Sequence, residues 1–330
     1  MATRASARTT RPASSEIETA RRFLAGHFAP TRLIEATAVS KAAGKRVYLK
    51  LEMELPTASF KVRGAMWALA EKMKKEAVAE VVASSTGNHG AAVAYAALKL
   101  GVKATIFLPE HCNPVKRERI VGLGAAIVEK GSADLAAAFE AASAYARKTG
   151  AYFLNDATDS VLPAGPATIG SEIMEQLPGT QAVYVPMGDT ALIRGVAAAI
   201  KQTKTDVKIV GVQAKTAPSY YLSWKSGVAT STETCNTIAD GLATRTPDAG
   251  NVRAIRELVD EVILVSDEEM LRAIGILLMQ EHVVAEPAGA AATAALLQRR
   301  NQTGENGVAL VTGANVPREI LERALQLGQA

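Results

Sequence analysis

The chain has 330 residues, which is enough for one large or two medium-sized domains. Hydrophobic residues make up 48% and charged residues 21%, values typical of a packed globular protein. The net charge of +4 and the aromatic content of 5% argue against a nucleic-acid-binding surface. Two cysteines are too few for a disulfide framework or a zinc site and fit a reducing cytoplasm. No apolar run is long enough to span a membrane.

The N-terminal third begins with a polar segment. Residues 1–14 are rich in Arg, Ser and Thr, and we interpret them as a disordered tail, with a transit peptide as the alternative. The apolar spacing of residues 16–25 predicts an amphipathic helix. The alternating segment 46–53 predicts a strand. Residues 62–75 predict a helix that ends in a lysine cluster, as the helix dipole favours.

The rest of the chain alternates between strands and helices, which predicts parallel βαβ units with helices on both faces of the sheet. In the first series we expect strands at 80–83, 103–108, 125–128 and 152–154, and helices at 91–100, 114–123, 132–148 and 165–176. In the second series we expect strands at 182–186, 208–213, 261–265 and 307–312, and helices at 191–203, from 266 onward and at 287–300. Residues 218–227 could be helix or loop, and residues 237–250 look irregular.

Lys61 is the first candidate for chemistry. It follows a Pro-Thr-x-Ser turn, which suits neither a helix interior nor a strand, because Pro56 lacks an N–H and the hydroxyls compete for backbone hydrogen bonds. A lysine at a desolvated helix start has a lowered pKa and can act as a nucleophile or form a Schiff base. Taken alone, this segment is better explained by an ordinary solvated lysine, and the rest of the chain has to overturn that interpretation.

Three further junctions follow strands and could bind anions or a cofactor, since ligands of parallel sheets lie beyond the carboxyl ends of the strands. Residues 84–90 place glycines and Asn88 at a helix N-terminus, where backbone N–H groups bind carboxylates. Residues 188–192 could cradle a phosphate, although Asp189 is an acid at that place. Residues 312–315 bring the Thr312 hydroxyl to the same edge. Plain helix caps and strand ends are the alternatives for each junction alone.

Together, these segments resemble a known family. The run K-L-E-M-E-L-P-T-A-S-F-K-V-R-G, residues 50–64, matches every fixed position of the cofactor-lysine segment of fold-type II pyridoxal-phosphate enzymes, K-x-E-x-x-x-P-T-x-S-F-K-x-R-G. S-S-T-G-N-H-G resembles their substrate-carboxylate loop. Residues 237–243, 286–290 and 311–315 resemble further segments of the family in the same order. The resemblance runs from about residue 18 to about residue 325 and is closest to the serine/threonine dehydratase and serine racemase branch.

The resemblance implies an α/β fold with two doubly wound domains rich in parallel sheet, like the tryptophan synthase β subunit. Residues 15–81 and 154–330 would form the large domain that binds pyridoxal 5'-phosphate. Residues 82–153 would form the smaller domain that carries the substrate loop. The resemblance also implies a homodimer.

The resemblance assigns roles to single residues. Lys61 would form the Schiff base and move the Cα proton, with Ser85 and Thr86 as further catalytic candidates. Asn88 would bond the phenolic oxygen of the cofactor, and Thr312 would face its pyridine nitrogen. The substrate carboxylate would bind to Ser85, Thr86, Gly87, Asn88 and His89. The cofactor-binding residues would be Phe60, Lys61, Asn88, Gly188, Asp189, Thr190, Ala191, Leu192, Gly241, Glu286 and Thr312.

The sequence departs from the family in three places. The phosphate loop of the family is a run of glycines, whereas here it reads G-D-T-A-L from Gly188. Racemases carry a second serine where this chain has Thr86, which adds a methyl group. The acids that bind a divalent cation in some relatives are replaced by Gln213, Lys215 and Ser219, so we predict no metal.

We therefore predict a lyase that eliminates water from a β-hydroxy-α-amino acid such as threonine, serine, phenylserine or hydroxyaspartate, and yields a 2-oxo acid and ammonia. A neutral hydroxyl at the pyridine nitrogen would leave the ring unprotonated and favour this elimination over long-lived carbanions. The alternatives are a threonine-synthase-like β- or γ-replacement, an amino-acid racemase and a catalytically silent binding protein on the same fold. A nicotinamide dehydrogenase is disfavoured because no glycine fingerprint follows a first strand.

Overall fold

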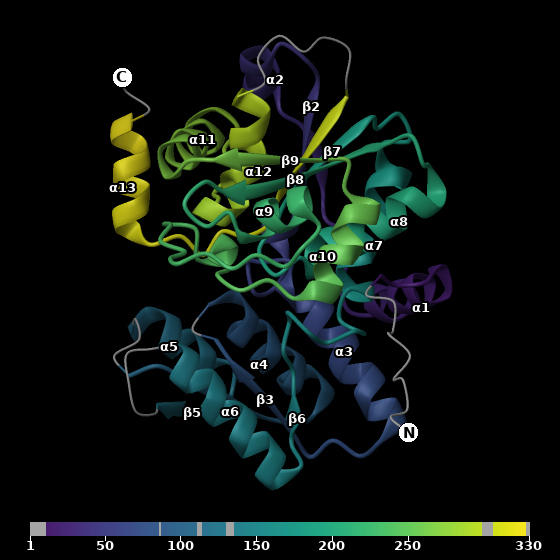
Figure 1. Cartoon of the computed structure of the whole chain (residues 1–330), viewed down its shortest axis with the longest axis vertical. Helices are drawn as coiled ribbons and strands as arrows, with labels where there is room; N and C mark the ends of the chain where they lie inside the picture. The colour runs from purple at the N-terminus through teal and green to yellow at the C-terminus, as the bar shows by residue number, and fades with distance from the viewer. Residues whose placement is uncertain (1–10, 86, 111–113, 130–134, 299–305, 328–330) are drawn as a thin grey trace.

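The computed structural model describes residues 11–85, 87–110, 114–129, 135–298 and 306–327. Two sheets organise these residues (Figure 1). One sheet has six strands in the order β1-β2-β10-β7-β8-β9, and the other has four in the order β5-β4-β3-β6. All strand pairs are parallel except β1 with β2, which is antiparallel.

The six-stranded sheet is buried on both faces. Its strands are β1 (Leu33–Glu35), β2 (Val47–Leu51), β7 (Ala182–Pro186), β8 (Lys208–Ala214), β9 (Glu261–Val265) and β10 (Gly307–Val311). In β10, Ala309 and Val311 join one apolar core, whereas Val308 and Leu310 join the other, because successive side chains point to opposite faces. Since both faces are covered, strands such as β7 and β10 are apolar along their whole length.

Helices cover both faces of this sheet (Figure 1). One face packs against α2 (Thr37–Ala43), α11 (Asp267–Gln280), α12 (Pro287–Gln298) and α13 (Arg318–Leu327). The other face packs against α1 (Ser14–Ala25), α7 (Ala164–Gln176), α8 (Ala191–Thr203) and α10 (Ala249–Leu258). The short helix α9 (Ser219–Ser226) follows β8. Helix α11 begins with a capping box, in which the Ser266 hydroxyl accepts a hydrogen bond from the N–H of Glu269 and the Glu269 carboxylate accepts one from the N–H of Ser266.

The four-stranded sheet forms the lower part of Figure 1. Its strands are β3 (Glu80–Ser84), β4 (Lys103–Leu108), β5 (Ala126–Glu129) and β6 (Tyr152–Phe153). The helices that alternate with them are α4 (Asn88–Leu100), α5 (Pro114–Gly122) and α6 (Leu135–Thr149). Helix α3 (Lys61–Lys75) packs against both α4 and α7, so that it joins the two halves of the structure.

The topology confirms the predicted parallel βαβ arrangement, and most predicted elements lie within a few residues of the observed ones. Helix α4 begins at Asn88 instead of residue 91, so Asn88 and His89 lie in its first turn. Four observed elements, β1, α2, α10 and α13, have no counterpart among the predicted elements. Most of the predicted N-terminal tail, residues 1–10, lies outside the described residues. None of the helices in the described part combines the length and hydrophobicity that a membrane span requires.

Candidate active site

A cavity of about 850 Å³ lies between the two sheets. Its walls include the segments that follow β3, β6, β7 and β10, which is where ligands bind in parallel α/β sheets. The cavity brings together all the described residues that the sequence predicted for the site: Phe60, Lys61, Ser85, Gly87, Asn88, His89, Gly188, Asp189, Thr190, Ala191, Leu192, Gly241, Glu286 and Thr312. Thr86, the remaining predicted residue, lies outside the described residues.

Backbone pairing places Lys61 in this cavity. The turn before it is tied to the segment after β10, because the N–H of Phe60 donates to the carbonyl of Thr312 over 3.0 Å and Ser59 forms an antiparallel bridge with Gly313. The Ser59 hydroxyl accepts a hydrogen bond from the N–H of Lys61 over 3.2 Å. Ala58 adopts a left-handed conformation with φ 49°, which makes the turn sharp. Lys61 therefore begins α3 at the cavity wall.

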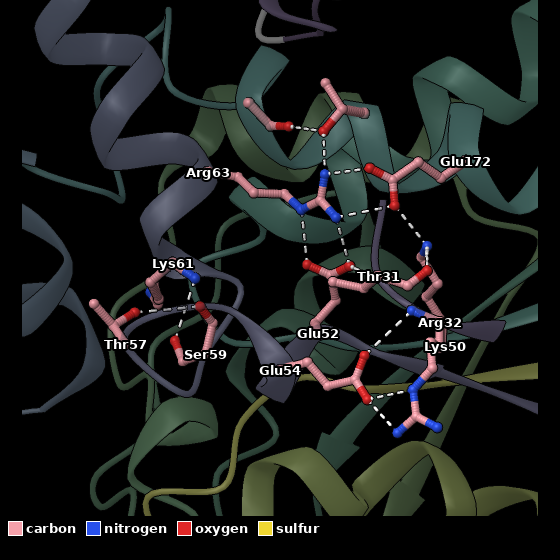
Figure 2. A network of polar contacts seen from close by, with 12 residues as sticks. Thr31, Arg32, Lys50, Glu52, Glu54, Thr57, Ser59, Lys61, Arg63 and Glu172 are labelled. Carbon is pink, nitrogen blue, oxygen red and sulfur yellow. Dashed lines mark hydrogen bonds and ion pairs between the residues drawn. The ribbon is translucent and has the colours of Figure 1, made fainter. Parts of the chain in front are cut away.

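A buried ionic network fixes the start of α3 (Figure 2). Arg63, which is 2% exposed, donates to Glu52 over 2.8 Å and to Glu172 over 2.5 Å. Lys50 Nζ lies 2.5 Å from the other Glu172 oxygen. Two cations thus face two carboxylates, so the buried charges are balanced. The fixed Lys, Glu and Arg of the lysine motif therefore hold the helix that carries Lys61.

The Lys61 amine pairs with Asp156, a residue that sequence reasoning missed. Burial lowers the pKa of Lys61, but the Asp156 carboxylate outweighs this effect and holds the pKa above its ordinary value. Burial disfavours the Asp156 carboxylate, yet the charges of His89 and Lys61 hold its pKa well below its usual range. Asp156 follows the end of β6, and its position beyond a strand end is the signal that could have identified it.

His89 is a buried positioning residue of the same wall. Its Nε2 lies 2.9 Å from the carbonyl oxygen of Leu154, which can only accept, so Nε2 carries a proton. Its Nδ1 lies 3.7 Å from Asp156 Oδ2. The imidazole thus connects the first turn of α4 to the segment after β6.

Asn88, the neighbour of His89 in the first turn of α4, is held by two partners. Its Nδ2 donates to Glu286 Oε1 over 2.7 Å, and its Oδ1 accepts from Asn315 Nδ2 over 2.5 Å. Arg119, from α5, donates to the carbonyl of Thr57 over 2.6 Å and also contacts Asn315. These bonds fix the amide that the sequence assigned to the phenolic oxygen of the cofactor. The sequence did not predict Arg119 or the role of Asn315.

The loop from Gly188 to Leu192 lines the cavity and leads into the first turn of α8. A Cβ on Gly188 would lie 2.2 Å from the carbonyl oxygen of Gly241, so a side chain cannot fit there. Thr190 caps α8 in a left-handed conformation with φ 70°, and Ala191 begins the helix, so backbone N–H groups face the cavity end of α8. The loop thus combines a close approach of Gly188 to the Gly241 carbonyl with a helix N-terminus, and it does so without the glycine run that is usual in the family.

Asp189 is the acidic residue of this loop. The Thr244 hydroxyl donates to Asp189 Oδ1 over 3.2 Å. Burial raises the pKa of Asp189, and the neighbouring Asp156 carboxylate raises it further.

Comparison with known proteins agrees with this geometry. Residues 24–313 match the family described as pyridoxal-phosphate dependent enzyme. The chain is 37% identical to an L-threonine ammonia-lyase of Thermotoga maritima, over 95% of this chain and 78% of the relative. It is 35% identical to an L-threonine ammonia-lyase of Geobacter sulfurreducens, over 90% of this chain and 74% of the relative.

Solved structures give the same result. The processed form of threonine deaminase isoform 2 from Solanum lycopersicum superposes with a TM-score of 0.89 at 28% identity, over 98% of this chain and 91% of that chain. Maize serine racemase superposes with a TM-score of 0.86 at 27% identity, over 94% and 96% of the two chains. These comparisons confirm the resemblance inferred from the motifs, the α/β fold class and the cofactor, pyridoxal 5'-phosphate.

Proposed function

Because this chain belongs to the family of pyridoxal-phosphate-dependent enzymes, we propose that it is a lyase acting on β-hydroxy-α-amino acids. It would convert threonine or serine, and in a wider test phenylserine or hydroxyaspartate, to a 2-oxo acid and ammonia. The observation that carries the proposal is the placement of the Lys61 amine in one cavity with the predicted carboxylate loop and Thr312. The threonine ammonia-lyases among its relatives support threonine as the first substrate to test.

We propose that five parts of the cavity hold the cofactor. Lys61 would bind it covalently as a Schiff base, and Phe60 would pack against its ring. Asn88 would bond the phenolic oxygen, the 188–192 loop would bind the phosphate, and Thr312 would face the pyridine nitrogen. When bound, the cofactor supplies the electron sink for the pair left at the substrate Cα.

The residues of the chain would divide the elimination among them. The loop of Ser85, Gly87 and His89 binds the substrate carboxylate with N–H and hydroxyl donors. Once released from the cofactor, the Lys61 amine would take the proton from Cα, and the electron pair of the C–H bond would form the Cα–Cβ double bond. The β-hydroxyl would leave as water with the proton that Lys61 hands on to it. The resulting enamine takes up water and releases ammonia. Thr312 offers a neutral hydroxyl where a charged partner would strengthen the electron sink, which favours loss of the β-substituent.

The proposal also covers the domain arrangement, the oligomeric state and the compartment of the protein. We propose that the four-stranded sheet with its helices, about residues 82–153, acts as the smaller domain and closes on the substrate, since the cavity lies between the two sheets. The protein would be a homodimer of the cytoplasm. The low cysteine content supports that compartment, and sedimentation of the pure protein tests the dimer.

A substrate screen tests the activity. Purified protein is incubated with both stereoisomers of each β-hydroxy amino acid, and 2-oxo acid and ammonia are measured together with the chirality of the remaining substrate. We expect equal amounts of the two products, and no turnover in Lys61→Ala. Lys75→Ala, at the exposed end of the same helix, is the matched control. Change of chirality without oxo acid would indicate a racemase, and a need for an added nucleophile would indicate a replacement reaction.

A further inference from the structure

Arg194 lies directly beneath the 188–192 loop, one turn into α8, and the proposed chemistry gives it no role. Its side chain is buried, with 1% exposure. Its N–H donates to the carbonyl of Thr190 over 2.9 Å, and its Nε donates to the Thr190 hydroxyl over 3.1 Å. The guanidinium thus holds Thr190, the residue of the loop that has both a hydroxyl group and a left-handed backbone conformation.

The hydroxyl of Thr190 is arranged to donate outward. Because its oxygen accepts the hydrogen bond from Arg194, its own proton is left for a second partner. Thr190 lines the cavity, where the predicted phosphate site lies. A β-branched residue at φ 70° is strained, so the bond to Arg194 and the first turn of α8 have to keep it in place.

The charge of Arg194 also suits an anion in this loop. Burial lowers the pKa of Arg194 to about 10, while Tyr220, Asp248 and Asp189 act in the opposite direction. The guanidinium therefore remains positive at neutral pH. A buried cation is costly unless anions lie near it, and the anion bound at Thr190 would be one of them. Of the acids named here, Asp189 belongs to the loop itself and has a raised pKa because it is buried.

We propose that Arg194 positions Thr190 and supplies the positive charge with which this loop binds the phosphate of the cofactor. In this chain an arginine beneath the loop and a threonine within it take the place of a run of glycines. The proposal requires that the cofactor binds in this cavity, but it does not depend on which reaction the enzyme catalyses. Arg194 would be a positioning residue that acts through Thr190.

Binding of two aldehydes to the cofactor-free protein tests this role. Pyridoxal 5'-phosphate and pyridoxal differ only in the phosphate, and their affinities are measured by equilibrium dialysis. We expect Arg194→Gln to weaken pyridoxal phosphate binding by about 10- to 100-fold, as for loss of a charge-assisted hydrogen bond, and to leave pyridoxal binding unchanged. Arg253→Gln, on the exposed face of α10, is the matched control.

A double-mutant cycle separates positioning from charge. Thr190→Val keeps the branched shape and removes the hydroxyl, so its effect and that of Arg194→Gln are expected to overlap in the double variant. Additive effects would overturn the positioning role, and equal losses for both aldehydes would overturn the phosphate role. If Arg194→Gln does not fold, Arg194→Lys and Thr190→Val must each lower the preference for the phosphorylated aldehyde. If the wild-type protein turns over no substrate but prefers pyridoxal 5'-phosphate to pyridoxal, and the variants lose this preference, the proposed reaction is refuted and the role of Arg194 is supported.

Discussion

Replacing Arg63 by Met is the sharpest test of how the lysine segment is held. The guanidinium is buried between Glu52 and Glu172 and donates to both (Figure 2). Methionine fills a similar volume but makes none of these bonds. Lys50 would then face two buried carboxylates alone, so one negative charge would be left without a partner.

The expected loss follows from this imbalance. Removing one partner of a buried ion pair costs about 3–5 kcal/mol. For a chain of 330 residues, an unfolding entropy of about 2.1 cal/mol/K per residue gives about 0.7 kcal/mol/K. The midpoint of thermal unfolding should therefore fall by about 4–7 °C. Because the network fixes the first turn of α3, the affinity for the cofactor should fall as well.

The pH dependence distinguishes this mechanism from loss of packing. Burial opposes ionisation of Glu172, but Arg63 and Lys50 outweigh it and lower the pKa of Glu172 in the folded protein. This carboxylate stabilises the wild type above its unfolded pKa, near the ordinary value of 4.5, and the contribution is lost as the pH falls through the folded pKa. In Arg63→Met the unpaired carboxylate can take up a proton, so the difference in stability should shrink as the pH falls.

Thermal unfolding of the cofactor-free proteins, followed by circular dichroism between pH 4 and pH 8, provides the measurement. Arg63→Lys is the matched variant, since it keeps the charge and loses the paired N–H donors. It should lie between the wild type and Arg63→Met. A deficit that is below about 1 kcal/mol, or that is constant with pH, would contradict the proposed role of the network.

Two further substitutions test the cavity itself. Asp156→Asn should lower the pKa of the free Lys61 amine, so that capture of pyridoxal phosphate by the cofactor-free protein reaches its maximal rate at lower pH; an unchanged pH profile would show that the carboxylate does not govern the lysine. Gly188→Ala should weaken cofactor binding by about 5- to 150-fold, because the added Cβ meets the Gly241 carbonyl and the overpacking costs about 1–3 kcal/mol. Titration of the cofactor-free protein measures this loss, and wild-type affinity would refute the cradle.

The sequence predicted the centre of the site because each of its parts has a strict local requirement. The turn before Lys61 needs a proline and hydroxyl residues, and the loop at Gly188 needs a residue without a side chain. Such requirements are visible in a single chain. The order of the parallel strands then brings these segments to one edge, since β2, β10 and β7 are adjacent.

Other features depend on tertiary contacts that no local pattern records. Asp156 reaches Lys61 only because the two-residue strand β6 pairs with β3. The register of this pairing depends on contacts between segments far apart in the sequence. Helix α10 was missed, although its N-cap Asp248 accepts a hydrogen bond from Asn251, because the glycine and proline around its start indicate a loop. The three-residue strand β1 is ordered by its antiparallel pairing with β2.

The lysine motif contains two kinds of residue, one buried in the protein and one lining the cavity. The two kinds support different predictions. Lys50, Glu52 and Arg63 are buried in an ionic network and do not line the cavity, so their presence reports the fold. Lys61 lines the cavity, and its proposed role is to bind the cofactor. The motif therefore identifies the family, whereas the choice of substrate has to be determined by residues outside it.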